Sequence, residues 1–159
     1  MVKTDVVNRP RLMHYSYKPL TELYNCDQKQ NFRPKPKGLW VSVGREWRDW
    51  CRSERYSHIG QRSYIVSIDW KNIKVINNKD QLKAFTEKYQ CNTGVSLLDE
   101  YGLNWENISQ DYSGIVIFPY LWECRNDPRT NWYYGWDIAS GCIWDISCVK
   151  KVTLVSKSY

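Results

Sequence analysis

Aromatic residues gather in one stretch, from Asn131 to Asp145, and this stretch constrains the fold more than any other part of the chain. Three Trp and two Tyr fall within these fifteen residues, more than an ordinary core strand needs. Gly135 and Gly141 interrupt the run, as expected where a strand bends or the backbone approaches a neighbour closely. Trp and Tyr combine a large apolar area with a polar group. The stretch is therefore interpreted either as a pair of core strands or as part of a binding site, and the binding site is our hypothesis.

The composition is that of an ordinary globular protein apart from its aromatic residues. Hydrophobic residues make up 42% of the chain and charged residues 25%, which argues against disorder. Its nine Trp and twelve Tyr, against three Phe, favour a surface that contacts both core and ligand. With 159 residues and no visible repeat or linker, we expect a single domain over residues 1–159, of which residues 1–10 form a flexible N-terminal segment.

The net charge of +6 favours anionic partners such as a dinucleotide, a nucleic acid or an acidic protein surface. The basic residues are dispersed rather than gathered in one run, so a non-specific nucleic-acid sleeve is not favoured. Six cysteines and two histidines show no CxxC pair and no recognisable zinc-ligand set, and we expect no metal.

The sequence shows neither a signal peptide nor an apolar run of membrane-spanning length. We therefore expect an intracellular, cytoplasmic protein that does not associate with membranes. Its cysteines are expected to be reduced and to serve mostly as small core residues.

Apolar periodicity and the positions of Pro and Gly predict strands and short helices in alternation. Strands are expected over residues 11–16, 38–43, 62–68, 73–76, 114–118 and 149–155, with two more in the aromatic stretch. Helices are expected over 18–24, over 46–55 with Trp47 and Trp50 in the core, from Asn78 or Asp80 to Tyr89, and after an N-cap at Asn104. Residues 27–37 are predicted to form a loop, 91–103 are ambiguous, and 121–130 form a loop or a short helix. The predicted fold is a compact α+β domain with mixed or antiparallel β-sheets that form a cleft, and short flanking helices.

Three separated segments form an ordered pattern, although the common hydrolase, kinase and dinucleotide-binding motifs do not occur. His14 lies in the first predicted strand. Trp40 lies in the second, within Lys35-Pro36-Lys37-Gly38-Leu39-Trp40-Val41-Ser42, and residues 137–143 form a late polar and acidic cluster. This order resembles the ADP-ribosyltransferase superfamily, in its diphtheria-toxin and poly(ADP-ribose) polymerase branch. In that family a His opens the first core strand, an aromatic residue follows a glycine in a second strand, and an acidic residue stands near the start of a late strand.

The resemblance implies that NAD is the substrate and that ADP-ribose is transferred to a macromolecular acceptor, either a protein or a nucleic acid. A carboxylate near the reacting sugar would stabilise the oxocarbenium-like centre that forms as the glycosidic bond breaks. The implied catalytic residues are His14, which would also hold a ribose hydroxyl, and Asp137. The implied NAD-binding residues are His14 at the ribose, Trp40 or Tyr15 beside the nicotinamide, Ser42 and Ser140 in the pocket, and a basic residue such as Arg11 or Arg45 at the pyrophosphate.

The chain departs from the family pattern at two positions. Trp40 stands where the family has Tyr, which keeps a stacking surface but removes a hydroxyl. If the late strand starts at Gly141, the family's acidic position falls near Ser140, and Asp137 lies three residues earlier. Asp137 is our choice for the catalytic carboxylate, and Asp145 or a catalytically dead enzyme are the alternatives. Both carboxylates lie in or beside aromatic surroundings, where desolvation is expected to perturb a pKa.

The small size fits a phage- or bacterium-encoded effector that acts on a host target. The main alternative is a non-catalytic module whose aromatic-lined cleft binds a nucleotide, a nucleic acid or a protein, because basic charge with exposed aromatics is also typical of single-strand binding proteins. A structural subunit that uses the aromatic stretch as an interface is a third possibility.

Overall fold

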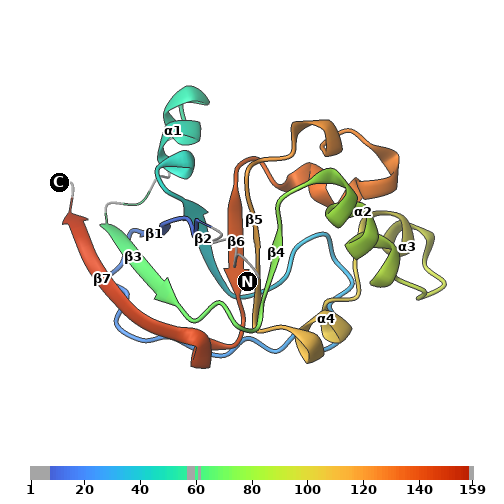
Figure 1. The fold of residues 1–159 in the computed structure, drawn as a ribbon, viewed down its shortest axis with the longest axis horizontal. Coiled ribbons are helices and arrows are strands. Elements are labelled where there is room, and N and C mark those ends of the chain that lie inside the picture. Colours follow the sequence, from blue (N-terminus) through green and yellow to red (C-terminus); the bar gives the residue numbers. More distant parts are fainter. Residues whose placement is uncertain (1–7, 57–59, 61, 158–159) are drawn as a thin grey trace, which may run out of the picture.

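A seven-stranded mixed sheet organises the computed structural model, which describes residues 8–56, 60 and 62–157 (Figure 1). The order across the sheet is β4-β5-β6-β2-β1-β3-β7. β4 and β5 pair in parallel, and the other neighbouring strands pair antiparallel. The strands are β1 (Leu12–Ser16), β2 (Leu39–Val43), β3 (Arg62–Ile68), β4 (Ile73–Ile76), β5 (Gly114–Ile117), β6 (Ser140–Ile143) and β7 (Val149–Lys157).

Short helices complete an α+β fold, as the sequence predicts. In Figure 1, α2 and α3 lie together beyond β4, whereas β7 forms the opposite edge of the sheet. Asn78 and Asn104 cap α2 and α4, each accepting a hydrogen bond from a backbone N–H three residues later. The helices are α1 (Glu46–Ser53), α2 (Lys79–Lys88), α3 (Ser96–Tyr101) and α4 (Trp105–Asp111), with 3-10 segments η1 (Trp122–Cys124), η2 (Pro128–Gly135) and η3 (Ile146–Cys148).

Alternate residues of β5 face two separate hydrophobic clusters. Ile115 and Ile117 pack with the aromatic residues of α2, α4 and η2. Val116 packs in a second cluster with Leu12 and Val41 from β1 and β2. Side chains of a strand alternate between the two faces of the sheet, so the two clusters cover both faces of β5. All four residues of the strand are therefore buried, and none is polar.

The aromatic stretch forms one strand, β6, rather than the two that the sequence suggested. Its first half is the 3-10 segment η2, in which Trp132 and Tyr133 are buried. Asp127 starts this segment by accepting a hydrogen bond from the backbone N–H of Arg129, with Pro128 at the first helical position. Pro is well suited to that position because its fixed φ fits a helix and its missing N–H would be unpaired there anyway. Asp127-Pro128 was therefore a helix-start signal that the sequence interpretation missed.

Residues 18–24 form no helix, contrary to expectation. None of their side chains is buried, so no packing stabilises a helix too short to persist alone. Trp47 and Trp50 also differ from the prediction, because α1 buries only Cys51. The two indoles are half-buried and stack on each other, with ring centroids 5.2 Å apart.

Candidate functional site

A cavity of about 380 Å³ lies beside β1 and β2, where the pairing of the two strands ends. The ladder between them covers two residue pairs, Leu12 with Val43 and Met13 with Ser42. His14 follows the last pair, and its Nδ1 lies 2.7 Å from the carbonyl oxygen of Trp40. Because a carbonyl oxygen only accepts, Nδ1 bears the proton, and the neutral imidazole presents Nε2 as an acceptor.

Most of the residues that the sequence assigned to a site line this one cavity. Asp137 comes from the segment before β6, far along the chain from β1 and β2. Arg45 is not among the described residues that line the cavity; it is exposed at the N-cap of α1. The predicted residues that line it are His14, Tyr15, Trp40, Ser42, Asp137 and Ser140.

Trp40 forms an aromatic side of the cavity together with Trp136. The edge of one indole meets the face of the other, with ring centroids 5.0 Å apart. The ammonium of Lys35 lies 5.7 Å from the centre of the Trp40 ring, within the range of a cation–π contact. The indole N–H of Trp136 is buried and has no acceptor among the described residues, which is uncommon for a buried donor. Sequence reasoning did not name Lys35 or Trp136 as site residues, although Lys35 stands in the motif that contains Trp40 and Trp136 lies in the aromatic stretch.

Asp137 forms an ion pair with Arg125, whose guanidinium nitrogen lies 3.1 Å from the carboxylate. About 28% of the Arg125 side chain and 29% of the Asp137 side chain are exposed, so water screens the pair and its contribution to stability is modest. The guanidinium also lies 5.3 Å from the ring centre of Tyr134. Arg125 was missed because its segment was predicted only as a charged loop or short helix.

Two hydrogen bonds through Ala139 fix the segment that presents Asp137. Its carbonyl accepts from the backbone N–H of Val43 at 3.0 Å. Its own N–H donates to the carboxylate of Glu46 at 2.7 Å, which ties the start of α1 to the start of β6. Burial raises the pKa of Glu46, and this hydrogen bond opposes the shift.

The start of the late strand has a serine and no carboxylate. Ser140 pairs directly across the ladder with Ser42 of β2. Both hydroxyls are buried and donate to nearby carbonyls, Ser140 to Ile138 and Ser42 to Gly44, each at 3.1 Å. The two serines therefore shape the cavity, and Asp137 is the carboxylate among its described lining residues.

Burial governs the protonation of the two titratable groups that β1 contributes. It lowers the pKa of His14, against the smaller opposing effect of the hydrogen bond to Trp40. It raises the pKa of Tyr15. Both side chains are consequently neutral at pH 7.

Asp145 has a structural position outside the cavity. Its carboxylate accepts from the backbone N–H of Ser147 at 3.0 Å and so caps η3. Hydrogen bonds with Ser147 lower the pKa of Asp145. The sequence offered Asp145 as an alternative catalytic acid, whereas the structure uses it as a cap, and its pKa is perturbed mainly by hydrogen bonding rather than by the expected desolvation.

The cysteines do not form a nucleophilic site with His14. All six lie among the described residues and are free thiols, and five are buried, as expected for small core residues. Burial raises the pKa of Cys142 well above the usual range of a thiol, which keeps it protonated and unreactive. No cysteine is among the described residues that line the cavity.

Comparison of the chain with protein-family models, curated proteins and solved structures gave no significant match. In the described part of the chain, His, Cys, Asp and Glu side chains form no group of three or more that would hold a metal ion. None of the helices placed in residues 8–56 and 62–157 is long and apolar enough to cross a bilayer.

Proposed function

We propose that this protein is an NAD-dependent ADP-ribosyltransferase that modifies a macromolecular target. The observation that supports the proposal is the convergence of His14, Trp40 and Asp137 on one cavity, although they come from three distant parts of the chain. The cavity volume of about 380 Å³ lies within the range of small-molecule sites. It suits the nicotinamide and its ribose, with the adenosine half extending outward.

In this proposal, His14 and the aromatic residues hold the nicotinamide riboside in one pose. The hydrogen bond from Nδ1–H to the carbonyl oxygen of Trp40 fixes the imidazole ring, so Nε2 is left to accept a hydrogen bond from a ribose hydroxyl. Trp40 or Tyr15 stacks on the nicotinamide ring. Holding the sugar in a reactive orientation lowers the entropic part of the barrier.

Asp137 stabilises the reacting sugar in the same scheme. The bond between ribose C1′ and the nicotinamide nitrogen breaks, and nicotinamide leaves with the electron pair. Positive charge develops on the ribose, and a carboxylate next to it lowers the energy of that state. A nucleophilic atom of the acceptor then bonds to C1′ and gives up its proton to water or to a nearby base.

The ion pair with Arg125 supports a second candidate, a module that binds a nucleotide without transferring it. A carboxylate that is already neutralised by a guanidinium at 3.1 Å stabilises a cationic sugar less. In the transferase scheme, Arg125 must therefore turn away from Asp137 when the substrates bind.

The cysteines of the chain are free thiols, which suits an effector, encoded by a phage or a bacterium, that works in a cytoplasm.

The direct test is incubation of the protein with labelled NAD and host lysate, followed by measurement of nicotinamide release and of label on protein and nucleic acid. The transferase scheme predicts both for the wild type and neither for His14→Ala, whose folding is checked by circular dichroism. NAD binding without turnover would favour the non-catalytic module. If the wild type neither binds NAD nor turns it over, both candidates are rejected.

A further inference from the structure

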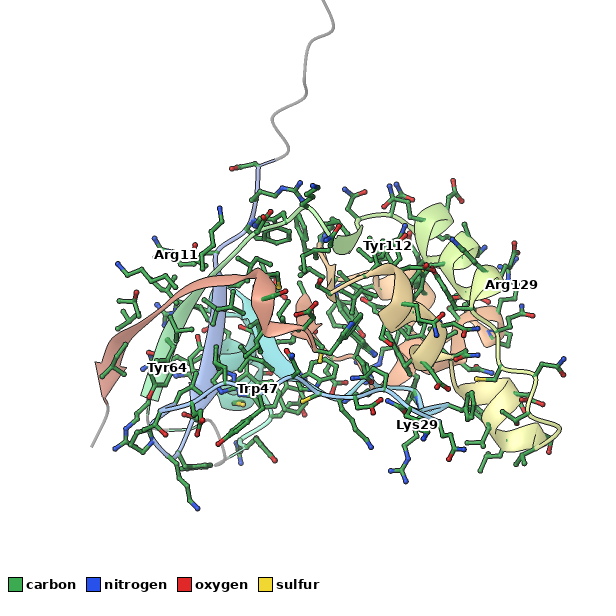
Figure 2. The ribbon with its side chains drawn as sticks, turned by 90° about the horizontal axis from the view of Figure 1, so that it is seen from below. Arg11, Lys29, Trp47, Tyr64, Tyr112 and Arg129 are labelled. Atoms are coloured by element: carbon green, nitrogen blue, oxygen red, sulfur yellow. The ribbon has the colours of Figure 1, made fainter. Side chains whose placement is uncertain are left out.

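A groove of about 850 Å³ adjoins the cavity that we propose binds NAD, called the NAD cavity below. Lys35 and Gly135 line both spaces, so the two share a border. The groove lies between the loop that joins β1 to β2, the end of α3, the segment around Arg125 and the second half of η2. In Figure 2 this loop, which carries Lys29, runs along one side of the molecule. None of the functions proposed above uses this groove.

The groove concentrates positive charge that the sequence shows only as dispersed residues. Four basic side chains line it: Arg33, Lys35, Lys37 and Arg125. The first three are exposed, and no acidic residue is among the described residues that line it. Arg125 pairs with Asp137, but that carboxylate lines the adjoining cavity rather than the groove. Cations grouped in this way attract phosphates, and binding releases the counterions of those phosphates.

Two aromatic rings accompany this charge. Tyr134 is 58% exposed and Tyr101 is 42% exposed, and both line the groove. The guanidinium of Arg125 already lies over the Tyr134 ring, at 5.3 Å from its centre. Exposed aromatic rings among cations provide stacking surfaces for unpaired bases, and this combination is typical of proteins that bind single strands.

We infer that the groove binds single-stranded nucleic acid and that this strand is the acceptor of the proposed transfer. The basic side chains contact its phosphates, and the two tyrosines stack on its bases. Double-stranded nucleic acid does not fit this mode, because paired bases do not expose their faces for stacking. The acceptor assignment rests on the proposed transferase activity, whereas the binding itself does not.

Arg125 connects the groove to the chemistry of the first cavity. It lines the groove and pairs with Asp137, which lines the NAD cavity. A phosphate bound at Arg125 competes with the Asp137 carboxylate for the guanidinium. Binding of the strand thus brings an acceptor nucleotide to the border of the NAD cavity and exposes the carboxylate that the transfer requires.

The experiment measures binding of fluorescent oligonucleotides, about 12 nucleotides long, to the full chain by anisotropy over a range of salt concentrations. A single strand should bind with a slope of log K against log salt of about −3, because each neutralised phosphate contributes about −0.7 and four cations are available. Combining Arg33→Gln with Lys37→Gln should reduce that slope by about half. Tyr134→Ala should weaken binding about fivefold or more.

The matched control residues are not among those that line the groove. Lys150→Gln with Lys151→Gln removes the same charge from β7, at the opposite edge of the sheet. Tyr24→Ala removes an exposed tyrosine that lines neither space. Both controls should bind the single strand as the wild type does. Equal effects of groove and control variants, tighter binding of a duplex, or binding only to an acidic polypeptide would each overturn the inference.

The acceptor role has a separate readout, which is label transfer from NAD to the bound strand. Transfer to the single strand that falls in the groove variants supports the full proposal. Binding without any NAD turnover would retain the groove as a nucleic-acid site and reject the transferase. NAD turnover with label only on protein would retain the transferase and reject the strand as its acceptor.

Discussion

The carboxylate of Asp137 and the guanidinium of Arg125 lie 3.1 Å apart, and each faces a different space. Asp137 lines the cavity that also contains His14 and Trp40. Arg125 lines the basic groove and lies over Tyr134. In the proposed reaction, this pair links the cavity for NAD with the groove for the acceptor, so a substrate bound in one space would change the charge available in the other.

Replacing the carboxylate tests this view first. Asp137→Asn keeps the shape of the side chain but removes its charge, so NAD turnover should fall about a hundredfold or more. Nicotinamide release, followed by chromatography, gives the rate. Asp145→Asn is the matched control, because Asp145 caps η3 outside the cavity and Asn is an equally good cap. A greater loss in Asp145→Asn than in Asp137→Asn would reassign the catalytic acid.

The partly buried imidazole of His14 predicts a pH dependence of stability. Burial places the folded-state pKa of His14 below its usual value of 6.5. Between the two values the unfolded chain binds more protons than the native protein, so stability rises with pH in that window. The contribution is complete above pH 6.5 and is lost as the pH falls through the folded-state pKa.

Urea unfolding of the wild type and His14→Gln between about pH 7.5 and about pH 5.5 measures this effect. The free energy of unfolding of the wild type should fall more steeply with decreasing pH than that of His14→Gln. The absolute stabilities of the two proteins need not agree, because only the difference in slope reports the titration. Parallel curves would show that His14 does not titrate differently in the folded and unfolded chains.

A methyl group at Gly141 should destabilise the centre of the sheet. An added Cβ would lie 2.5 Å from the carbonyl oxygen of Ile115 and 2.8 Å from a methyl carbon of Val116. Because backbone must move to accommodate it, we expect Gly141→Ala to lower the free energy of unfolding by about 1–3 kcal/mol. Gly135→Ala is the control, since its Cβ would meet only the flexible end of Lys35 at 3.3 Å. Denaturant unfolding compares the two, and an equal loss would contradict the prediction.

A buried hydrogen bond between α2 and η2 gives a further test of the core. The indole N–H of Trp132 donates to the hydroxyl of Thr86 at 2.8 Å, and that hydroxyl donates to the carbonyl of Leu82 at 2.8 Å. Thr86→Val keeps the volume but leaves the buried indole N–H without an acceptor, which should cost about 1–3 kcal/mol of stability. Thr86→Ser restores the hydroxyl, so it should recover most of the loss in thermal or denaturant unfolding.

Local sequence signals were sufficient for most strands and helix starts. β3 and β5 follow from β-branched residues, and the starts of α2 and α4 follow from Asn78 and Asn104, because side-chain caps act within a few residues. Gly141 was expected where backbones approach closely, and its neighbour is the backbone of β5. The sequence could not reveal that β4 pairs with β5 rather than with β3, because strand pairing depends on contacts between distant segments.

The ordered motifs determined that His14, Trp40 and Asp137 belong together as candidates, since residue type and order are properties of the chain. Tertiary structure alone decided that they line one cavity, that Arg45 is not among its described lining residues, and that Arg125 pairs with the acid. It also decided that dispersed cations meet in one groove. The physical reason is that electrostatic and stacking interactions act over a few ångströms of space, and the fold sets which residues come within that range.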